Sequence, residues 1–195
     1  MKNKKIDKRQ IYLDVAQLHY HSLKTGFLPT LGVNFLALMY KCIDEANFSI
    51  LITKYKKTKL TGFVTGSLGS SSLFKLMLKH PISLIFTLAP IIFNLKKLRK
   101  VINICKHISS SERKKYPKPE LLSICVNPDY QGQGIGFELY QQLLQYFKSV
   151  PVSEFIIVVG QSLKANSFYK NQGAKKIGEL QIHPNVNSNI FIQRL

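Results

Sequence analysis

A glycine-rich loop between a short apolar strand and an amphipathic helix constrains the fold of this 195-residue chain more than any other feature. Residues 121–126 have the composition of a strand, and the apolar spacing from about Gln133 to Lys148 predicts a helix. Between them, Gly132, Gly134 and Gly136 let a ligand approach the backbone closely. Unpaired backbone N–H groups and the positive end of the helix dipole meet at such a turn. The loop therefore predicts a binding site for a pyrophosphate.

Two familiar phosphate-binding loops do not fit these residues. A P-loop requires Lys and then Ser or Thr after its last glycine, whereas Phe137 and Glu138 follow Gly136. A dinucleotide-binding fold requires an acidic residue at the end of the next strand, which is predicted over Phe155–Val159 and is followed by Gly160. The sequence thus disfavours both an NTPase and a dinucleotide-binding protein.

The loop resembles motif A of the GNAT acetyltransferases, in which Arg or Gln, two residues, Gly, one residue, and Gly or Ala follow one another. Gln131, Gly134 and Gly136 match this pattern. The Val-x-Pro turn that precedes the motif in the family is present at 126–128. Residues 165–173 read Ala-x-x-Phe-Tyr-x-x-x-Gly, as in a second family motif. Two motifs at the family's spacing make the resemblance specific.

The resemblance implies a fold of the α/β (α+β) class, with a mixed central sheet that splays at the cofactor site. It is specific over 120–174, and the residues upstream match only in the order of their elements. Those predicted elements are helices over about 10–24 and 31–45 and strands over 48–53 and 60–68, the strands being joined by a lysine-rich connection. We expect one domain over 1–195, with a basic and apolar helical insertion at about 70–118, between the third and fourth strands.

By the same resemblance, acetyl-CoA is the co-substrate and lies between two splayed parallel strands, and no metal is implied. Its pyrophosphate would contact the loop's backbone N–H groups, and its pantetheine would lie along the strand before the loop. A backbone N–H near Cys125 or Val126 would polarise the thioester carbonyl. Ser162 stands where the family often has an asparagine that contacts CoA, and Asn166 is nearby. The implied cofactor-binding residues are Ile124, Cys125, Val126, Gln131, Gly132, Gln133, Gly134, Ile135, Gly136, Ser162, Asn166 and Tyr169.

The resemblance also implies two catalytic residues. Tyr169 stands at the family position that donates a proton to the departing CoA thiolate, the alternative being that it only packs on the cofactor. Glu120, at the start of the strand, matches the glutamate with which some members deprotonate the amine, directly or through water, the alternative being a solvated strand-end carboxylate. Cys125 is expected to be a buried apolar residue, because the family transfers acetyl directly to an amine. His19 and His21 are read as surface histidines, with acceptor binding as the alternative.

The charge of the chain is concentrated in one region. The net charge is +18, and residues 51–119 carry 15 basic residues against 1 acidic residue. The apolar stretch Pro81–Leu95 in this region falls short of the roughly 20 residues that a spanning helix requires. Two interpretations stay open: an amphipathic element that lies on an anionic membrane or covers the acceptor site, or core helices with a solvated lysine face.

The sequence therefore predicts an N-acetyltransferase that uses acetyl-CoA and a small primary amine, with an amino sugar, nucleotide- or lipid-linked, favoured as acceptor. A protein or peptide acetyltransferase is one alternative, and a basic nucleic-acid or membrane-surface binding module with a vestigial CoA site is another. No specific nucleic acid is expected as a partner, and a homodimer is compatible with the sequence. The three cysteines fit no disulfide or zinc pattern, and no signal peptide is recognisable, so a cytoplasmic location is expected, with peripheral contact at the inner membrane face as an option.

Overall fold

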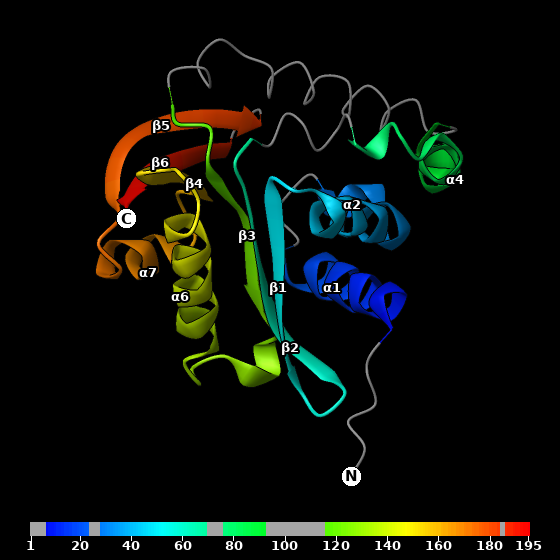
Figure 1. Cartoon of the computed structure of the whole chain (residues 1–195), viewed down its shortest axis with the longest axis horizontal. Helices are drawn as coiled ribbons and strands as arrows, with labels where there is room; N and C mark the ends of the chain where they lie inside the picture. The colour runs from blue at the N-terminus through cyan, green and yellow to red at the C-terminus, as the bar shows by residue number, and fades with distance from the viewer. Residues whose placement is uncertain (1–6, 24–27, 70–75, 93–115, 184–185) are drawn as a thin grey trace.

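A mixed sheet of six strands, in the order β1-β2-β3-β4-β6-β5, runs through the computed structural model (Figure 1). The structure describes residues 7–23, 28–69, 76–92, 116–183 and 186–195. The strands are β1 (Ser49–Lys56), β2 (Lys59–Ser67), β3 (Glu120–Val126), β4 (Glu154–Gly160), β5 (Lys175–His183) and β6 (Val186–Arg194). The helical elements are α1 (Lys8–Ser22), η1 (Leu28–Leu31), α2 (Val33–Glu45), α4 (Pro81–Ile92), η3 (Pro128–Tyr130), α6 (Ile135–Lys148) and α7 (Ala165–Asn171).

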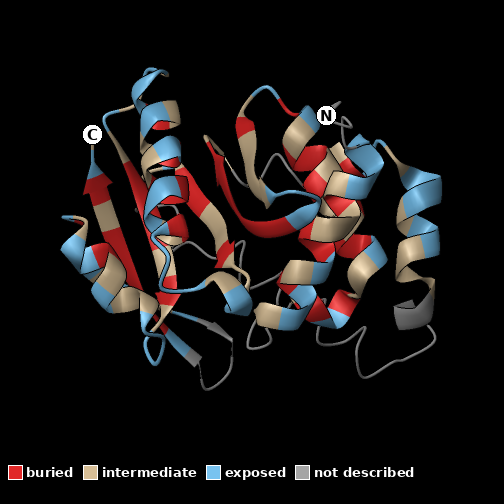
Figure 2. Ribbon diagram, turned by 90° about the horizontal axis from the view of Figure 1, so that it is seen from below, coloured by how far each residue is buried: buried red, intermediate tan, exposed pale blue. Residues whose placement is uncertain are grey.

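Helices cover both faces of the sheet, so β2 is buried on both sides. Figure 1 shows α1 and α2 on one face and α6 on the other. Alternate side chains of β2 enter two cores: Phe63 packs with Tyr40 of α2, and Val64 packs with Leu143 of α6. The red bands of Figure 2 follow these inner surfaces. The sheet is thus held between two apolar layers.

Two glycines of β2 let α6 approach the sheet closely. A Cβ atom added at Gly66 would lie 2.6 Å from Leu143 Cδ1, and one added at Gly62 would lie 3.0 Å from Leu139 Cδ1. Such contacts are too short for any larger residue without a shift of the helix. Because the glycine-rich loop leads into α6, this close packing also fixes the position of the loop.

The parallel pair β3–β4 opens soon after it begins. Only Glu120↔Ile156 and Leu121↔Ile157 are paired, and the two strands then diverge. On its other edge β3 stays paired with β2, with a register shift between Thr65 and Gly66 that leaves Leu122 as an extra residue. The splayed, mixed sheet expected for the GNAT fold is confirmed.

The predicted elements are present, with two differences. The lysine-rich connection is mostly strand, because β1 and β2 continue to a tight turn at Lys57 and Thr58, where Lys57 has a φ of 55°. The predicted insertion follows β2 and precedes β3, one strand earlier than expected, because two described strands, not three, come before it. Of that insertion the structure describes 76–92 and 116–118, and the basic residues at 96–100 lie outside the described part.

Helix α4 lies within the apolar stretch predicted in this insertion. It has 12 residues and none of them is charged. Among the helices of the described residues, none is long and apolar enough to cross a bilayer. Its inner side packs Leu84 and Leu88 on a small core that includes Phe35 of α2 and Met77.

Candidate active site

The glycine-rich loop begins with a short turn that is tied to the sheet. The Asn127 side chain accepts a hydrogen bond from the Asp129 backbone N–H at 3.1 Å, and the Asn127 N–H donates to the Thr61 carbonyl at 2.9 Å. Gly132 and Gly134 then adopt φ values of 76° and 78°, which glycine reaches without strain. These conformations turn the chain directly into α6.

The loop presents donors in the way that an anion site requires. Gly134 caps α6, so the first N–H groups of that helix, beginning at Ile135, have no intrahelical acceptor. A Cβ atom at Gly132 or Gly134 would meet nothing within 4 Å, which leaves open space above the backbone. Gln131, Gln133 and both of these glycines are exposed. The residues predicted to hold a pyrophosphate therefore form an open cradle at a helix N-terminus.

Lysines of the β1–β2 hairpin lie beside this cradle. Lys59 Nζ is 2.7 Å from Asp129 Oδ2 and 5.4 Å from the centre of the Tyr130 ring, and Lys54 pairs with Glu138 in the first turn of α6. Both carboxylates of the cradle are thus paired with cations and repel an anion less. The sequence motifs do not identify these lysines, because the hairpin is far from the loop in the sequence and the pairing of β2 with β3 brings the two together.

The strand before the loop runs along the opening between β3 and β4. Ile124 and Val126 lie beyond the last β3–β4 pair and are half-buried against the core of the α6 face. Cys125 points to the opposite face, where burial raises the pKa of its thiol to about 11. A thiol of this kind is a buried apolar group at neutral pH, as predicted, and it is a poor nucleophile.

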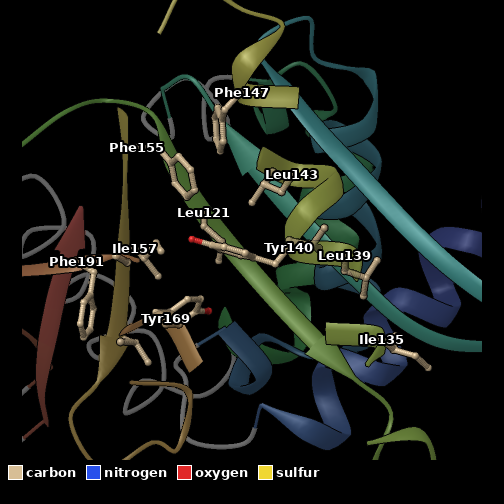
Figure 3. Close-up of a cluster of buried hydrophobic side chains, with 13 residues drawn as sticks. Leu121, Ile135, Leu139, Tyr140, Leu143, Phe147, Phe155, Ile157, Tyr169 and Phe191 are labelled. Atoms are coloured by element: carbon tan, nitrogen blue, oxygen red, sulfur yellow. The ribbon is translucent and has the colours of Figure 1, made fainter. Parts of the chain in front are cut away.

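Tyr169 points into the same opening from α7. Its ring packs against Tyr140 and Phe191, with ring centres 5.9 and 6.4 Å away, and Figure 3 shows its hydroxyl directed from the β4 side toward β3. Among the described residues no hydrogen bond of this hydroxyl is found, and Tyr169 as a whole is 3% exposed. Burial raises the pKa of Tyr169, which keeps the proton on the oxygen.

Glu120 lies where β3 and β4 are still paired. It is opposite Ile156 on one side and Ser67 on the other, next to the point of divergence. Its exposure is 7%, which contradicts the alternative of a solvated strand-end carboxylate. Glu120 thus lies on β3 at the closed end of the opening, and its side chain is on the sheet face opposite that of Leu121, which packs in the same core as Tyr169.

Two more of the predicted residues lie where β4 leads into α7: Ser162 in the turn and Asn166 in the first turn of the helix. Ser162 is exposed. The Asn166 amide donates to the Gly160 and Leu163 carbonyls at 2.9 and 2.6 Å, and its oxygen accepts from Asn189 Nδ2 at 2.7 Å. Asn166 therefore ties α7, and with it the tyrosine of the opening, to the ends of β4 and β6.

The two histidines of α1 differ from one another. His21 is exposed, as predicted, whereas His19 is 3% exposed and its Nδ1 lies 2.5 Å from the Tyr40 hydroxyl. The interpretation of His19 as a surface residue is therefore wrong. Its helical position faces α2, and burial lowers the pKa of its imidazole to about 4.

A groove of about 460 Å³ lies on the α1 side of the carboxyl end of β3. Its lining is mostly hydrogen-bonding side chains: Asp14, Gln17, Leu18, His21, Ser22, Thr58, Lys59, Leu60, Asn127 and Pro128. The Ser22 hydroxyl is buried without a partner among the described residues. Within the same part of the chain, no group of three or more His, Cys, Asp or Glu side chains could hold a metal ion.

Solved structures of other proteins share the fold of this chain. An N-acetyltransferase from Staphylococcus aureus Mu50 is 10% identical, with 97% of this chain and 96% of that chain covered and a TM-score of 0.63. An aminoglycoside 6'-N-acetyltransferase complexed with coenzyme A is 10% identical, with 95% and 91% covered and a TM-score of 0.61. The paia N-acetyltransferase from Thermoplasma acidophilum, in complex with coenzyme A, is 12% identical, with 96% and 94% covered and a TM-score of 0.58. At these identities the likeness shows the fold alone.

Sequence comparison identifies the family. No curated protein sequence matches the chain. The family model described as the acetyltransferase (GNAT) family matches residues 20–174, which include the glycine-rich loop, the opening between the strands and Tyr169. Since that match covers most of the chain, the protein belongs to the GNAT family of acetyltransferases and is an acyltransferase.

Proposed function

We propose that the protein transfers the acetyl group of acetyl-CoA to a primary amine of a small molecule, through a single acetyltransferase domain over residues 1–195. The observation that carries this proposal is the divergence of β3 and β4 after Leu121↔Ile157, at the end of which the cradle opens. An extended ligand with a pyrophosphate at one end and amides along its length fits both parts. No second structural feature of the described residues competes for this assignment.

Residues around the opening would contact each part of acetyl-CoA. Backbone N–H groups of Gln131–Gly136 would hold the pyrophosphate, and Ile124–Val126 would hydrogen-bond the pantetheine as an added strand would. The backbone N–H near Cys125 or Val126 would polarise the thioester carbonyl. These interactions use backbone groups, so the side chains of this strand are free to pack on both cores.

Transfer requires one proton to leave the amine and one to reach the thiolate. The amine nitrogen forms a bond to the carbonyl carbon, and the carbon–sulfur bond then breaks. Glu120 would accept the amine proton, directly or through water, and Tyr169 would donate its proton to the departing sulfur. Tyr169 carries this proton at neutral pH, and because burial raises its pKa, the transfer relies on the tyrosine being held close to the developing thiolate. An amine of pKa about 10.4 is neutral in only about one molecule in 2,500 at pH 7, so a base is required.

The groove beside α1 is our candidate for the part of the acceptor that lies away from its amine, because the groove is at the carboxyl end of β3 and Glu120 is at the amino end, about 20 Å along the strand. Hydroxyl, amide, imidazole and carboxylate groups line it, which suits a substrate that carries many hydroxyl groups and an amine. We therefore favour an amino sugar as the acceptor. The basic region at 51–119 favours a nucleotide- or lipid-linked form of that sugar, since both are anionic. The buried free thiols of Cys42 and Cys125 suit the reducing cytoplasm.

Native mass spectrometry with acetyl-CoA, followed by thiol release over a panel of amines, tests the reaction. We expect one bound CoA per chain and thiol release with amino sugars. Binding weaker than the millimolar range together with no turnover on any amine would overturn the proposal. If basic peptides were acetylated and amino sugars were not, the proposed acceptor would be wrong and the proposed reaction would stand.

Two matched variants test the groove. Asp14 accepts hydrogen bonds from Tyr55 at 2.9 Å and from Gln10 at 2.8 Å, so Asp14→Asn keeps an acceptor in place but removes the charge from the groove. Asp44 accepts from Tyr12 at 2.7 Å outside the groove, which makes Asp44→Asn the control. We expect Asp14→Asn alone to raise the acceptor KM, with CoA binding unchanged. An equal effect of both variants would remove the groove from the proposal.

A further inference from the structure

The outer side of α4 is apolar and exposed, although a soluble surface helix normally has a polar outer side. The exposed fractions are 71% for Ile82, 62% for Ile85 and 75% for Phe86. Leu78, one turn before Ile82, is 66% exposed. Within α4, Ile82 is three residues from Ile85 and four from Phe86, so these side chains lie on one side of the helix, and Leu78 precedes them in the adjoining turn. We call these four residues the α4 stripe.

The α4 stripe is unusual within this molecule. It contains four of the eight large hydrophobic side chains that are exposed among the described residues. The other side of α4 already packs on α2 through Leu84 and Leu88. The helix is therefore held against the domain while its stripe stays exposed to solvent (Figure 2). A contiguous exposed apolar patch of this kind marks a surface that binds something. This finding also excludes, for α4, the interpretation of a core helix with a solvated lysine face.

The charge around the stripe indicates what it binds. Helix α4 itself carries no charge, Lys79 precedes it and is exposed, and Lys96, Lys97, Arg99 and Lys100 follow within eight residues of Ile92 in the sequence. The region 51–119 has a single acidic residue. Apolar side chains flanked by cations match a bilayer with anionic headgroups, which offers acyl chains and phosphates at the same depth.

The length of the uncharged stretch that contains α4 decides how it would lie. In the sequence this stretch runs from Pro81 to Leu95, and as a helix its 15 residues would span about 23 Å, short of a hydrocarbon core of about 30 Å. The helix would therefore lie in the plane of the interface, with the stripe buried in the acyl boundary and the exposed Lys79 at the headgroups. We propose that the α4 stripe docks the protein on an anionic lipid surface, a role independent of the acetyl transfer proposed above.

Vesicle sedimentation of the full chain, without acetyl-CoA, tests this docking. The probes are vesicles of phosphatidylcholine alone and of phosphatidylcholine mixed with phosphatidylglycerol. We expect binding to the mixed vesicles that is at least about ten-fold tighter than to the neutral ones and that weakens as salt is added. No binding to either vesicle, or equal binding to both at every salt concentration, would overturn the proposal.

A triple variant tests the stripe itself. Ile82→Gln, Ile85→Gln and Phe86→Gln together keep the helix, since glutamine is a good helix former and the three positions are exposed. We expect at least about ten-fold weaker binding to the mixed vesicles. Ile177→Gln is the control, because Ile177 is 44% exposed on β5, outside the stripe, and this change should leave vesicle binding as it is.

Light scattering across a range of concentrations separates a membrane from a second copy of the chain. If the triple variant lost self-association while the unchanged protein bound no vesicles, the stripe would be a dimer interface and the membrane proposal would be wrong. Unaltered thiol release by the triple variant on a water-soluble amine would show that the loss concerns docking and not folding.

Discussion

Replacing Tyr169 by phenylalanine separates its hydroxyl from its packing. The ring stays in the core between Tyr140 and Phe191, and only the oxygen that faces the opening is removed. Because that oxygen has no hydrogen-bond partner among the described residues, we expect the free energy of unfolding to change by no more than about 0.5 kcal/mol. Loss of a general acid lowers kcat by about 100-fold or more, which corresponds to about 2.7 kcal/mol of activation free energy.

Tyr140 provides the matched control from the same aromatic cluster. Its hydroxyl donates to Gln193 Oε1 at 2.9 Å, and this contact is buried. Tyr140→Phe leaves the Gln193 oxygen without that donor, at a cost of about 1–3 kcal/mol of folding stability. A domain of this size would then melt several degrees lower, by about 2–4 °C per kcal/mol. We expect kcat to stay within a few-fold, since this hydroxyl is turned to the sheet.

Thermal melts and steady-state thiol release on both variants give the answer. The expected pattern is crossed: Tyr169→Phe lowers kcat without lowering Tm, and Tyr140→Phe lowers Tm without lowering kcat. Because the pKa of Tyr169 is raised, kcat of the unchanged enzyme should not fall through ionisation of this tyrosine below pH 10. If Tyr169→Phe kept kcat within about three-fold, Tyr169 would only pack on the substrate and the proton-donor role would be refuted.

Three further predictions concern folding and the cradle. Burial lowers the pKa of His19 from 6.5 to about 4, so between these pH values the unfolded chain binds more protons than the folded one. The free energy of unfolding should therefore fall as the pH drops below 6.5, by about 2 kcal/mol at pH 5. Thermal melts of His19→Gln should lack this loss, and an equal loss in both proteins would contradict the prediction. Gly134→Ala strains a residue with φ of 78° by about 1–2 kcal/mol and should weaken CoA binding in calorimetry. Gly32→Ala, at a φ of 88° and with nothing within 4 Å of its Cβ, carries the same strain outside the cradle and should bind CoA as before. Gly66→Ala places a Cβ 2.6 Å from a leucine side chain of α6 and should destabilise the fold by about 1–3 kcal/mol in urea unfolding; an unchanged midpoint would show that α6 moves freely.

The carboxyl-terminal half of the fold could be predicted because local signals decide it. Turn glycines, a strand of branched residues and helical apolar spacing agree from residue 120 onward, and β3, α6 and β4 lie where the strand, helix and strand over 121–126, 133–148 and 155–159 were predicted. The hairpin was shortened in the prediction because lysines at 54–59 suggest a loop. In an exposed edge hairpin, however, lysines at alternate positions leave the strand intact and keep the edge from pairing with other chains.

The site could be predicted only as far as its residues are close in sequence. The loop and the tyrosine follow from two local motifs. The pairing of Lys59 with Asp129 joins residues 70 positions apart, and the burial of His19 depends on α2, so neither left a signal in the sequence. The exposed stripe of α4 could not be predicted for a similar reason, because a helix without charged residues gives no sign of which side faces solvent.

The divergence of β3 and β4 explains why the opening suits an extended ligand that carries amides. Strand β4 is paired with β6 along its whole length, from Glu154↔Arg194 to Gly160↔Ser188, so it does not depend on β3 for its stability. Beyond Leu121, however, the facing edges of both strands carry backbone N–H and C=O groups without a strand partner. Groups of this kind require hydrogen bonds when water is excluded. A ligand that supplies peptide-like groups at strand spacing meets this requirement, whereas a compact ligand would leave part of both edges unpaired.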